Sequence, residues 1–153
     1  MDLLKTVAVL ACAPGVAFAH VSVTPTTATA GGYQLLRFGV GHGCQDTHAT
    51  TALRIALPED LGAARPQPKP GWSLKIAKDS ITWEGSLPPD QYEEFLILVR
   101  MPASSGALAF PATQTCGPVV VRWDQPGGAN PAPKVTLTAT PAPAPNPGHD
   151  HQH

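Results

Sequence analysis

A histidine that directly follows a signal-peptidase motif is the residue of this chain whose position most suggests chemistry. A short apolar stretch over residues 6–16 comes after Lys5, and Ala17-Phe18-Ala19 then supplies the small residues that signal peptidase reads. Cleavage after Ala19 would give His20 a free α-amino group. That amine and the ring Nδ1 can chelate one metal ion, and both nitrogens suit Cu(II). The sequence therefore predicts a signal peptide over residues 1–19 and a copper ligand at His20.

Other interpretations of the N-terminal segment stay open. Cleavage at another position would make His20 an ordinary surface residue. Cys12 stands in a sequence that loosely resembles a lipidation site, but only six residues separate it from Lys5, and an apolar leader core needs roughly 7–15. A membrane anchor is disfavoured, because the apolar run is well short of the roughly 20 residues that a bilayer span needs.

Two cysteines and two further histidines are candidates for a site in the mature chain. Cys44 and Cys116 remain after leader removal, and a cysteine pair in an exported protein is typical of a disulfide. The alternative, ligation of a metal by both thiolates, is disfavoured because neither has a closely spaced partner. His42 lies in the loop before Cys44, so a disulfide would fix that loop and could let His42 face His20. A loop histidine without a metal is the competing interpretation, and it is the one that we favour for His48.

The chain has no signature of several other kinds of chemistry. It contains no HExxH, CxxC or GxSxG sequence and no glycine-rich phosphate loop before a helix. A net charge of −1 without a basic run argues against binding of nucleic acid. Met101 is the only methionine beyond the predicted leader, so a Cu(I) thioether site is not available. We therefore expect no catalytic residues and no small-molecule substrate, and we expect copper to bind as Cu(II) through nitrogen and oxygen.

Short alternating segments between glycine- and proline-rich turns predict an all-β domain over residues 20–138. Strands of about five residues at this spacing are typical of an immunoglobulin-like or fibronectin-like β-sandwich. No window shows a helical period. The segment 94–99 is almost wholly apolar, which predicts a central strand buried on both faces. The expected strands are 21–23, 33–40, 50–57, 72–76, 80–83, 94–99, 108–115, 119–123 and 135–138.

The alternation ends at residue 139, and residues 139–153 are expected to be a disordered tail. Alternating proline and small residues predict an extended linker. His149, His151 and His153 follow at every second position, with Asp150 among them, so the tail could be an auxiliary, weak metal site. Nothing would hold these histidines in a fixed geometry, and a solvated terminus is the alternative.

The three tryptophans are expected to have two different roles. Trp72 and Trp83 lie in predicted strands, where a tryptophan is first of all a core residue. Trp123 ends a strand just before a Pro-Gly-Gly turn. A ring in that position could form one wall of a surface metal site and keep water from one side.

An ordered set of short segments extends over the predicted domain, beginning with the histidine at the leader boundary. The segments are His20-Val21-Ser22-Val23-Thr24-Pro25, Ala30-Gly31-Gly32-Tyr33, Thr50-Thr51-Ala52-Leu53-Arg54-Ile55 with Pro58-Glu59, Pro68-Lys69-Pro70-Gly71-Trp72, Ile81-Thr82-Trp83-Glu84-Gly85, Tyr92-Glu93-Glu94-Phe95 and Val121-Arg122-Trp123. Each piece alone is weakly specific, but in this order they resemble the YcnI-type copper-binding domains of exported bacterial proteins.

The resemblance implies a β-sandwich that holds Cu(II) in a monohistidine brace. In such a brace the terminal histidine supplies amine and ring nitrogen, a carboxylate completes the set, and a tryptophan lies close. On this chain the brace residue would be His20 and the tryptophan Trp123. The glutamate that follows the second strand in the family is absent, since residues 40–44 read Val-Gly-His-Gly-Cys. We infer that His42 takes its place; the alternatives are Glu93, Glu94 and Asp46.

The sequence thus leads us to expect a copper-binding protein of the periplasm or the extracellular space that captures, stores or delivers copper and is not an enzyme. Other periplasmic or membrane copper-handling proteins could be its partners. A metal-free interaction module is one alternative. A copper oxygenase is a weaker one, because an aromatic content of 6% leaves few rings for a broad substrate-binding face.

Overall fold

The computed structural model describes residues 20–45 and 47–140, and over these residues the chain is built from β-strands alone. This confirms the predicted all-β class. None of the described residues belongs to a helix that could cross a membrane. The predicted signal peptide, Asp46 and the tail histidines His149, His151 and His153 lie outside the described residues.

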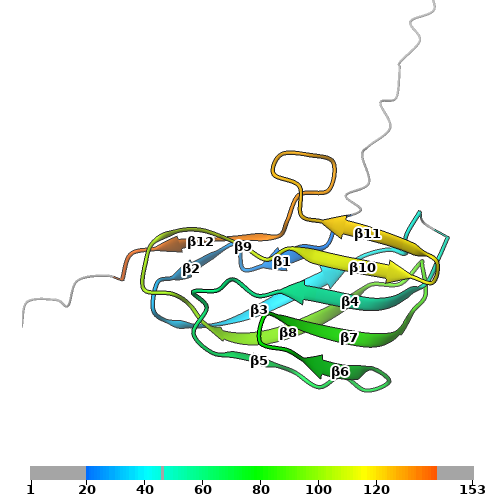
Figure 1. The fold of residues 1–153 in the computed structure, drawn as a ribbon, viewed down its shortest axis with the longest axis horizontal. Coiled ribbons are helices and arrows are strands. Elements are labelled where there is room, and N and C mark those ends of the chain that lie inside the picture. The colour runs from blue at the N-terminus through cyan, green and yellow to red at the C-terminus, as the bar shows by residue number, and fades with distance from the viewer. Residues whose placement is uncertain (1–19, 46, 141–153) are drawn as a thin grey trace, which may run out of the picture.

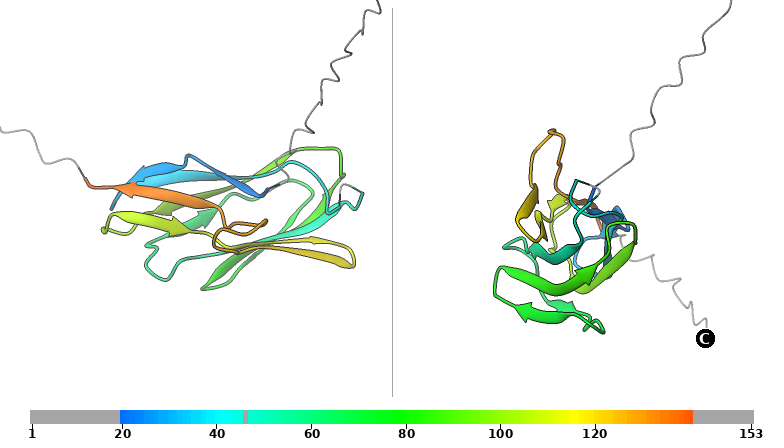
Figure 2. Two further views of the ribbon diagram at one scale, coloured as in Figure 1. Left: turned by 90° about the horizontal axis from the view of Figure 1, so that it is seen from above. Right: turned by 90° about the vertical axis from the view of Figure 1, so that its right-hand side faces the viewer.

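Two larger sheets face each other as a sandwich, and a small third sheet lies at one end, on the left in Figure 1. Figure 2 shows the layers from two further directions. All neighbouring strands are antiparallel except the parallel pair β2 and β12. The first sheet has the strand order β1 (Ser22–Thr24), β3 (Tyr33–Val40), β8 (Glu93–Arg100) and β5 (Ala64–Pro66). The second sheet has the order β11 (Val119–Trp123), β10 (Ala112–Cys116), β4 (Thr50–Ala56), β7 (Ser80–Leu87) and β6 (Ser73–Ile76). The third sheet has the order β2 (Thr27–Thr29), β12 (Lys134–Thr138) and β9 (Gly106–Ala109).

The core lies between the two larger sheets and is filled by every second residue of their strands. Its large aromatic members with at most 1% of their surface exposed are Phe38, Trp83, Phe95 and Phe110. The indole Nε1 of Trp83 donates to the carbonyl of Gln67 at 3.2 Å. Trp72 is partly buried and packs edge to face on Phe95, with 4.9 Å between ring centroids. The expectation that Trp72 and Trp83 are core residues therefore holds, with Trp72 at the margin.

Strand β8 corrects one expectation, since its apolar run is not buried on both faces. Phe95, Ile97 and Val99 point into the core, but Leu98 on the other face is 37% exposed. β8 is central within its sheet, between β3 and β5. None of the sheets that the structure describes covers this outer face, so a central position does not bury both sides of the strand. The predicted strand 108–115 is likewise two strands, because Phe110 and Pro111 separate β9 from β10, which belong to different sheets.

A disulfide joins Cys44, in the loop after β3, to Cys116 at the end of β10, which confirms the predicted pairing. Both sulfurs belong to buried residues, each 1% exposed. A second connection runs beside it, because the Gln114 side chain donates to the carbonyl of His42 at 2.9 Å and to the Thr50 hydroxyl at 2.8 Å. The loop that carries His42 is therefore tied to the second sheet.

Two glycines leave the outer face of the first sheet without side chains beside β1. Ser22, Gly39 and Glu94 form one row across β1, β3 and β8. A Cβ added at Gly39 would lie 2.7 Å from the Tyr92 hydroxyl and 2.9 Å from Ser22 Oγ, whereas at Gly41 the nearest atom is a Tyr92 ring carbon at 3.9 Å. Tyr92 therefore lies across Gly39, and only glycine permits this close approach.

Removal of the disulfide should lower the free energy of unfolding of a Cys44→Ala/Cys116→Ala variant by about 2–5 kcal/mol. The bond closes a loop between residues 72 positions apart, and the unfolded chain without it gains that conformational freedom. Urea denaturation would measure the difference, and the unmutated protein in a reducing agent should show a similar loss. A variant as stable as the oxidised protein would contradict the structural role of this bond.

Substitution of the two glycines tests the placement of Tyr92. Gly39→Ala should lower the free energy of unfolding by about 1–3 kcal/mol, because its methyl group must displace the Tyr92 ring and the Ser22 hydroxyl. Gly41→Ala is the matched control and should cost less than about 0.5 kcal/mol, as expected for a surface change without a clash. Equal losses for the two variants in urea denaturation would show that Tyr92 does not lie over Gly39.

Candidate metal centre

His20 lies directly before β1 and is held in place by one long-range hydrogen bond. Its ring Nε2 is 3.0 Å from the carbonyl oxygen of Ala129, in the segment between β11 and β12. A carbonyl oxygen only accepts, so Nε2 is the donor. In a neutral imidazole this tautomer places the ring lone pair on Nδ1. Nδ1 is the nitrogen that, together with the α-amine of the same residue, can close a chelate.

Trp123, at the end of β11, forms a wall on one side of His20. The two rings meet edge to face, with 5.3 Å between centroids and 62° between planes. Trp123 is 4% exposed, and its indole Nε1 is buried with no hydrogen-bond acceptor in the described part of the chain. Such a group costs about 1–3 kcal/mol when it has no acceptor. A buried N–H donor beside the candidate ligand is consistent with a site that takes up a further group.

An open hollow of about 580 Å³ lies on the outer face of the first sheet beside His20. Gly39 and Gly41 form its floor, while His20 and Tyr92 contribute the two ring side chains of its lining. The hollow is lined by His20, Ser22, Gly39, Gly41, Tyr92 and Pro131. None of the described residues that line it carries a carboxylate, and Ser22 and Tyr92 contribute its side-chain oxygens, both of them hydroxyl groups.

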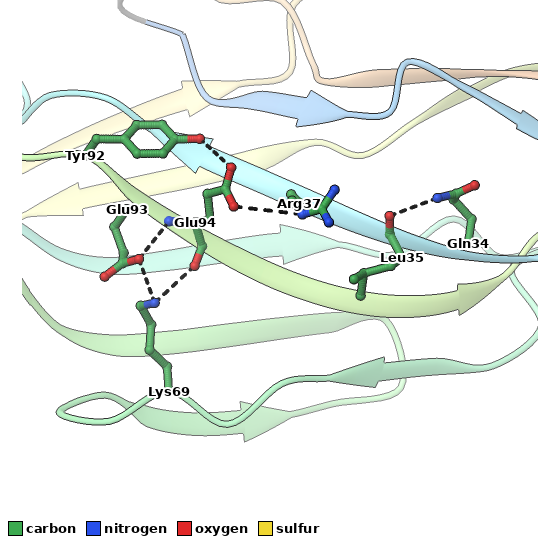
Figure 3. Close-up of polar contacts among 7 residues, drawn as sticks. All are labelled: Gln34, Leu35, Arg37, Lys69, Tyr92, Glu93 and Glu94. Atoms are coloured by element: carbon green, nitrogen blue, oxygen red, sulfur yellow. Dashed lines mark hydrogen bonds and ion pairs between the residues drawn. The ribbon is translucent and has the colours of Figure 1, made fainter.

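Tyr92 is held by a short polar chain that runs along the outer face, shown in Figure 3. Its hydroxyl donates to Glu94 Oε1 at 2.8 Å, and Glu94 Oε2 lies 3.9 Å from Arg37 Nε. Partial desolvation where the ring lies against the sheet is the first cause that raises the pKa of Tyr92 from its ordinary value, followed by the hydrogen bond to Glu94 and the charges of Glu94 and Glu93. A phenol is protonated at neutral pH, and the raised pKa acts in the same direction, so Tyr92 is the donor to Glu94.

The two adjacent glutamates that were alternatives for the metal site point to different places. Glu94 shares the outer face with Ser22 and Tyr92. Glu93 is bound instead by Lys69, whose Nζ lies 2.7 Å from Glu93 Oε1 and also donates to the Glu94 carbonyl at 3.1 Å. Figure 3 shows Lys69 on the side of the strand away from Tyr92. Of these two carboxylates, Glu94 is therefore the one on the His20 face.

The structure brings Trp123 to His20, but it does not place His42 in the lining of the hollow. The ring Nδ1 of His42 donates to the neighbouring Gly43 carbonyl. His48 pairs with Cys44 through the backbone, and its Nδ1 lies 3.0 Å from the Thr47 hydroxyl. Within residues 20–45 and 47–140 there is no group of three or more His, Cys, Asp or Glu that could hold a metal. A brace does not require such a group, because it takes two donors from one residue.

Sequence reasoning did not single out Tyr92, Ser22 or the two glycines. A signal was present in Gly39-Val40-Gly41, where glycine occupies two outward positions of a strand whose inward residues are apolar. That pattern indicates a close approach by another group, but it does not say which group. The identity of Tyr92 depends on the pairing of β3 with β8, which periodicity alone does not give.

Comparison with known proteins places the chain in a family. A family described as a domain of unknown function, DUF1775, matches residues 20–81 and 77–146. The copper-binding protein CutI of Bacillus subtilis (strain 168) is 28% identical over 106 residues, which cover 64% of this chain and 51% of that protein. The chain thus spans about half the length of this curated relative.

Two solved structures resemble the fold. An uncharacterized protein from Nocardia farcinica with an immunoglobulin-like fold is 33% identical, with a TM-score of 0.69 over 80% of this chain and 99% of that one. The human F-spondin reeler domain is 10% identical, with a TM-score of 0.52 over 78% and 91% of the two chains, and shows the fold alone. These matches confirm the predicted immunoglobulin-like sandwich, and with nearly the whole described domain matched by one family, the chain belongs to the DUF1775 family, the YcnI/CutI type predicted from its sequence.

Proposed function

We propose that this chain is an exported copper-binding protein whose mature form begins at His20 and holds Cu(II) through the α-amine and Nδ1 of that residue. The observation that carries the proposal is the hydrogen bond from His20 Nε2 to the Ala129 carbonyl. It selects the tautomer with its lone pair on Nδ1 and fixes the ring plane. Metal-ligating histidines are commonly held by a bond of this kind from the other ring nitrogen.

The choice of copper is supported by the relative and by the donor set. CutI is named a copper-binding protein, and the chain is 28% identical to it over 106 residues. An amine and an imidazole nitrogen with oxygen donors nearby suit Cu(II), which prefers nitrogen and oxygen ligands in tetragonal geometry. When bound, the ion would supply a compact positive charge for these donors to share.

The groups around His20 would contribute to the proposed site in different ways. Trp123 covers one edge of the imidazole and excludes water there. The glycine-floored hollow beside His20 leaves room for further donors. Glu94 stands on the same face and is the carboxylate alternative that the geometry supports better than Glu93. His42 remains a proposed ligand only if its loop rearranges toward the hollow.

We propose binding and transfer of copper as the role, and not catalysis. Among the described residues that line the hollow there is no pair of neighbouring acid and base side chains, and the aromatic rings of the lining are those of His20 and Tyr92. A copper oxygenase would need a wider aromatic face for its substrate. Copper capture, storage or delivery in the periplasm or outside the cell fits an open site of this kind, with other copper-handling proteins as donor or acceptor. The tail histidines His149, His151 and His153 would be an auxiliary metal site.

A single residue added before His20 tests the proposal. The comparison uses protein that begins at His20, protein with one extra alanine ahead of it, and a His20→Ala variant, all with the three tail histidines replaced by alanine. The added residue converts the amine into a peptide nitrogen, so Cu(II) affinity in isothermal titration should fall at least about tenfold, which is about 1.4 kcal/mol. His48→Ala should bind as the parent does. Equal affinity of the parent and the extended protein would rule out the brace.

A further inference from the structure

The strand register places Tyr92 directly across the sheet from His20. Ser22 pairs with Gly39 and Gly39 with Glu94. Continuing the same register by two residues on each strand sets His20, Gly41 and Tyr92 in the next row. His20 and Tyr92 precede the paired parts of β1 and β8, and both line the hollow together with Ser22 and Gly39 of the outer face. The glycine between them has no side chain to separate them, and both residues line one hollow.

The Tyr92 hydroxyl extends toward the β1 side of this row. The site of a Cβ on Gly39 is 2.7 Å from Tyr92 Oη and 2.9 Å from Ser22 Oγ, so both oxygens lie close to one point above the glycine. Ser22 is two residues from His20 on the same edge of the sheet. The phenol oxygen therefore lies over Gly39 beside Ser22, one row from His20, and Tyr92 shares the lining of the hollow with His20.

The hydrogen bond to Glu94 determines whether the phenol oxygen acts toward the hollow as a hydrogen-bond donor or through its lone pairs. A phenol has one proton, and Tyr92 commits it to Glu94 Oε1 at 2.8 Å. The oxygen retains acceptor capacity after it has donated that proton. An oxygen whose proton is directed away presents lone pairs to a cation. Glu94 meanwhile keeps a negative charge one hydrogen bond behind the oxygen, where it would offset positive charge in the hollow.

We propose that Tyr92 contributes its phenol oxygen to the metal held at His20, and that Glu94 is the positioning residue that orients this oxygen. The inference rests on the proposed function and names an oxygen ligand that compensates for the missing glutamate after the second strand. Tyr92 is favoured over Glu94 as the direct donor because Tyr92 lines the hollow, whereas the Glu94 carboxylate is engaged by the Tyr92 hydroxyl and lies near Arg37.

Pulsed electron paramagnetic resonance of Cu(II)-loaded protein with ring-deuterated tyrosine tests this directly. The chain contains only two tyrosines, and Tyr33 and Tyr92 are both 60% exposed, so Tyr33→Phe is a matched control for Tyr92→Phe. The expected result is a copper–deuterium coupling in the parent and in Tyr33→Phe that is lost in Tyr92→Phe. Phenylalanine keeps the ring over Gly39, so loss of the oxygen alone should weaken Cu(II) binding about tenfold.

The role of Glu94 is tested in the same experiment with two variants. Glu94→Gln retains an oxygen that can accept from Tyr92 and should keep the deuterium coupling, whereas Glu94→Ala should weaken it. Nitrogen couplings from His20 without deuterium coupling in the parent would overturn the inference and leave the proposed function standing. Absence of the His20 nitrogen couplings themselves would overturn both.

Discussion

The hydrogen bond between His20 and Ala129 is the interaction on which the geometry of the candidate centre depends. It joins residues 109 positions apart, linking the start of β1 to the segment between β11 and β12. The bond restrains the rotation of an imidazole whose residue precedes its strand. The bond holds the ring edge to face against Trp123 and determines which ring nitrogen carries the proton. A single backbone carbonyl therefore sets both the orientation and the tautomer of the proposed ligand.

A second constraint comes from the outer face of the first sheet, which must accommodate a tyrosine ring. On β3, Phe38 and Val40 point inward and are required by the core. Gly39 in the strand and Gly41 just after its end occupy the alternate positions, so this segment contributes apolar packing on one face and open space on the other. Glycine in a strand lowers the stability of that strand. Here the same glycines leave space for the Tyr92 ring and for the hollow beside His20.

Much of the fold can be predicted from the sequence, because a long strand contains enough alternating apolar and polar residues to be identified. Residues 33–40 and 119–123 were predicted with the bounds that β3 and β11 have in the structure. The short strands β2 and β5 were missed, since three residues give too little alternation. The burial of β8 was misjudged, because an apolar run does not tell whether a second layer covers its outer face. The pairing of Cys44 with Cys116 was predicted correctly, as only two cysteines remained after the predicted leader.

The candidate centre was less accessible to prediction than the fold. The contact of Trp123 with His20 was predicted only through the family resemblance. Tyr92 could not be found in that way, because its relation to His20 is a matter of cross-strand register, which a single sequence does not encode in its periodicity. His42 looked equally suitable by residue type, yet its loop is tied to β10 by the disulfide and by Gln114. Covalent anchoring fixes a loop but does not decide which site it faces.

The distribution of charge around the hollow bears on how a metal would be held there. Glu93 is paired with Lys69, and Glu94 stands behind the Tyr92 hydroxyl near Arg37, so each carboxylate already has a cationic neighbour. The described residues that line the hollow contribute no carboxylate. A cation bound by neutral donors, with a carboxylate one hydrogen bond away, is held less tightly than one bound directly by carboxylates, because the Coulomb attraction falls with distance and is shared with Arg37. An open face and neutral donors favour exchange of the ion over permanent retention, which is the property that capture and delivery require.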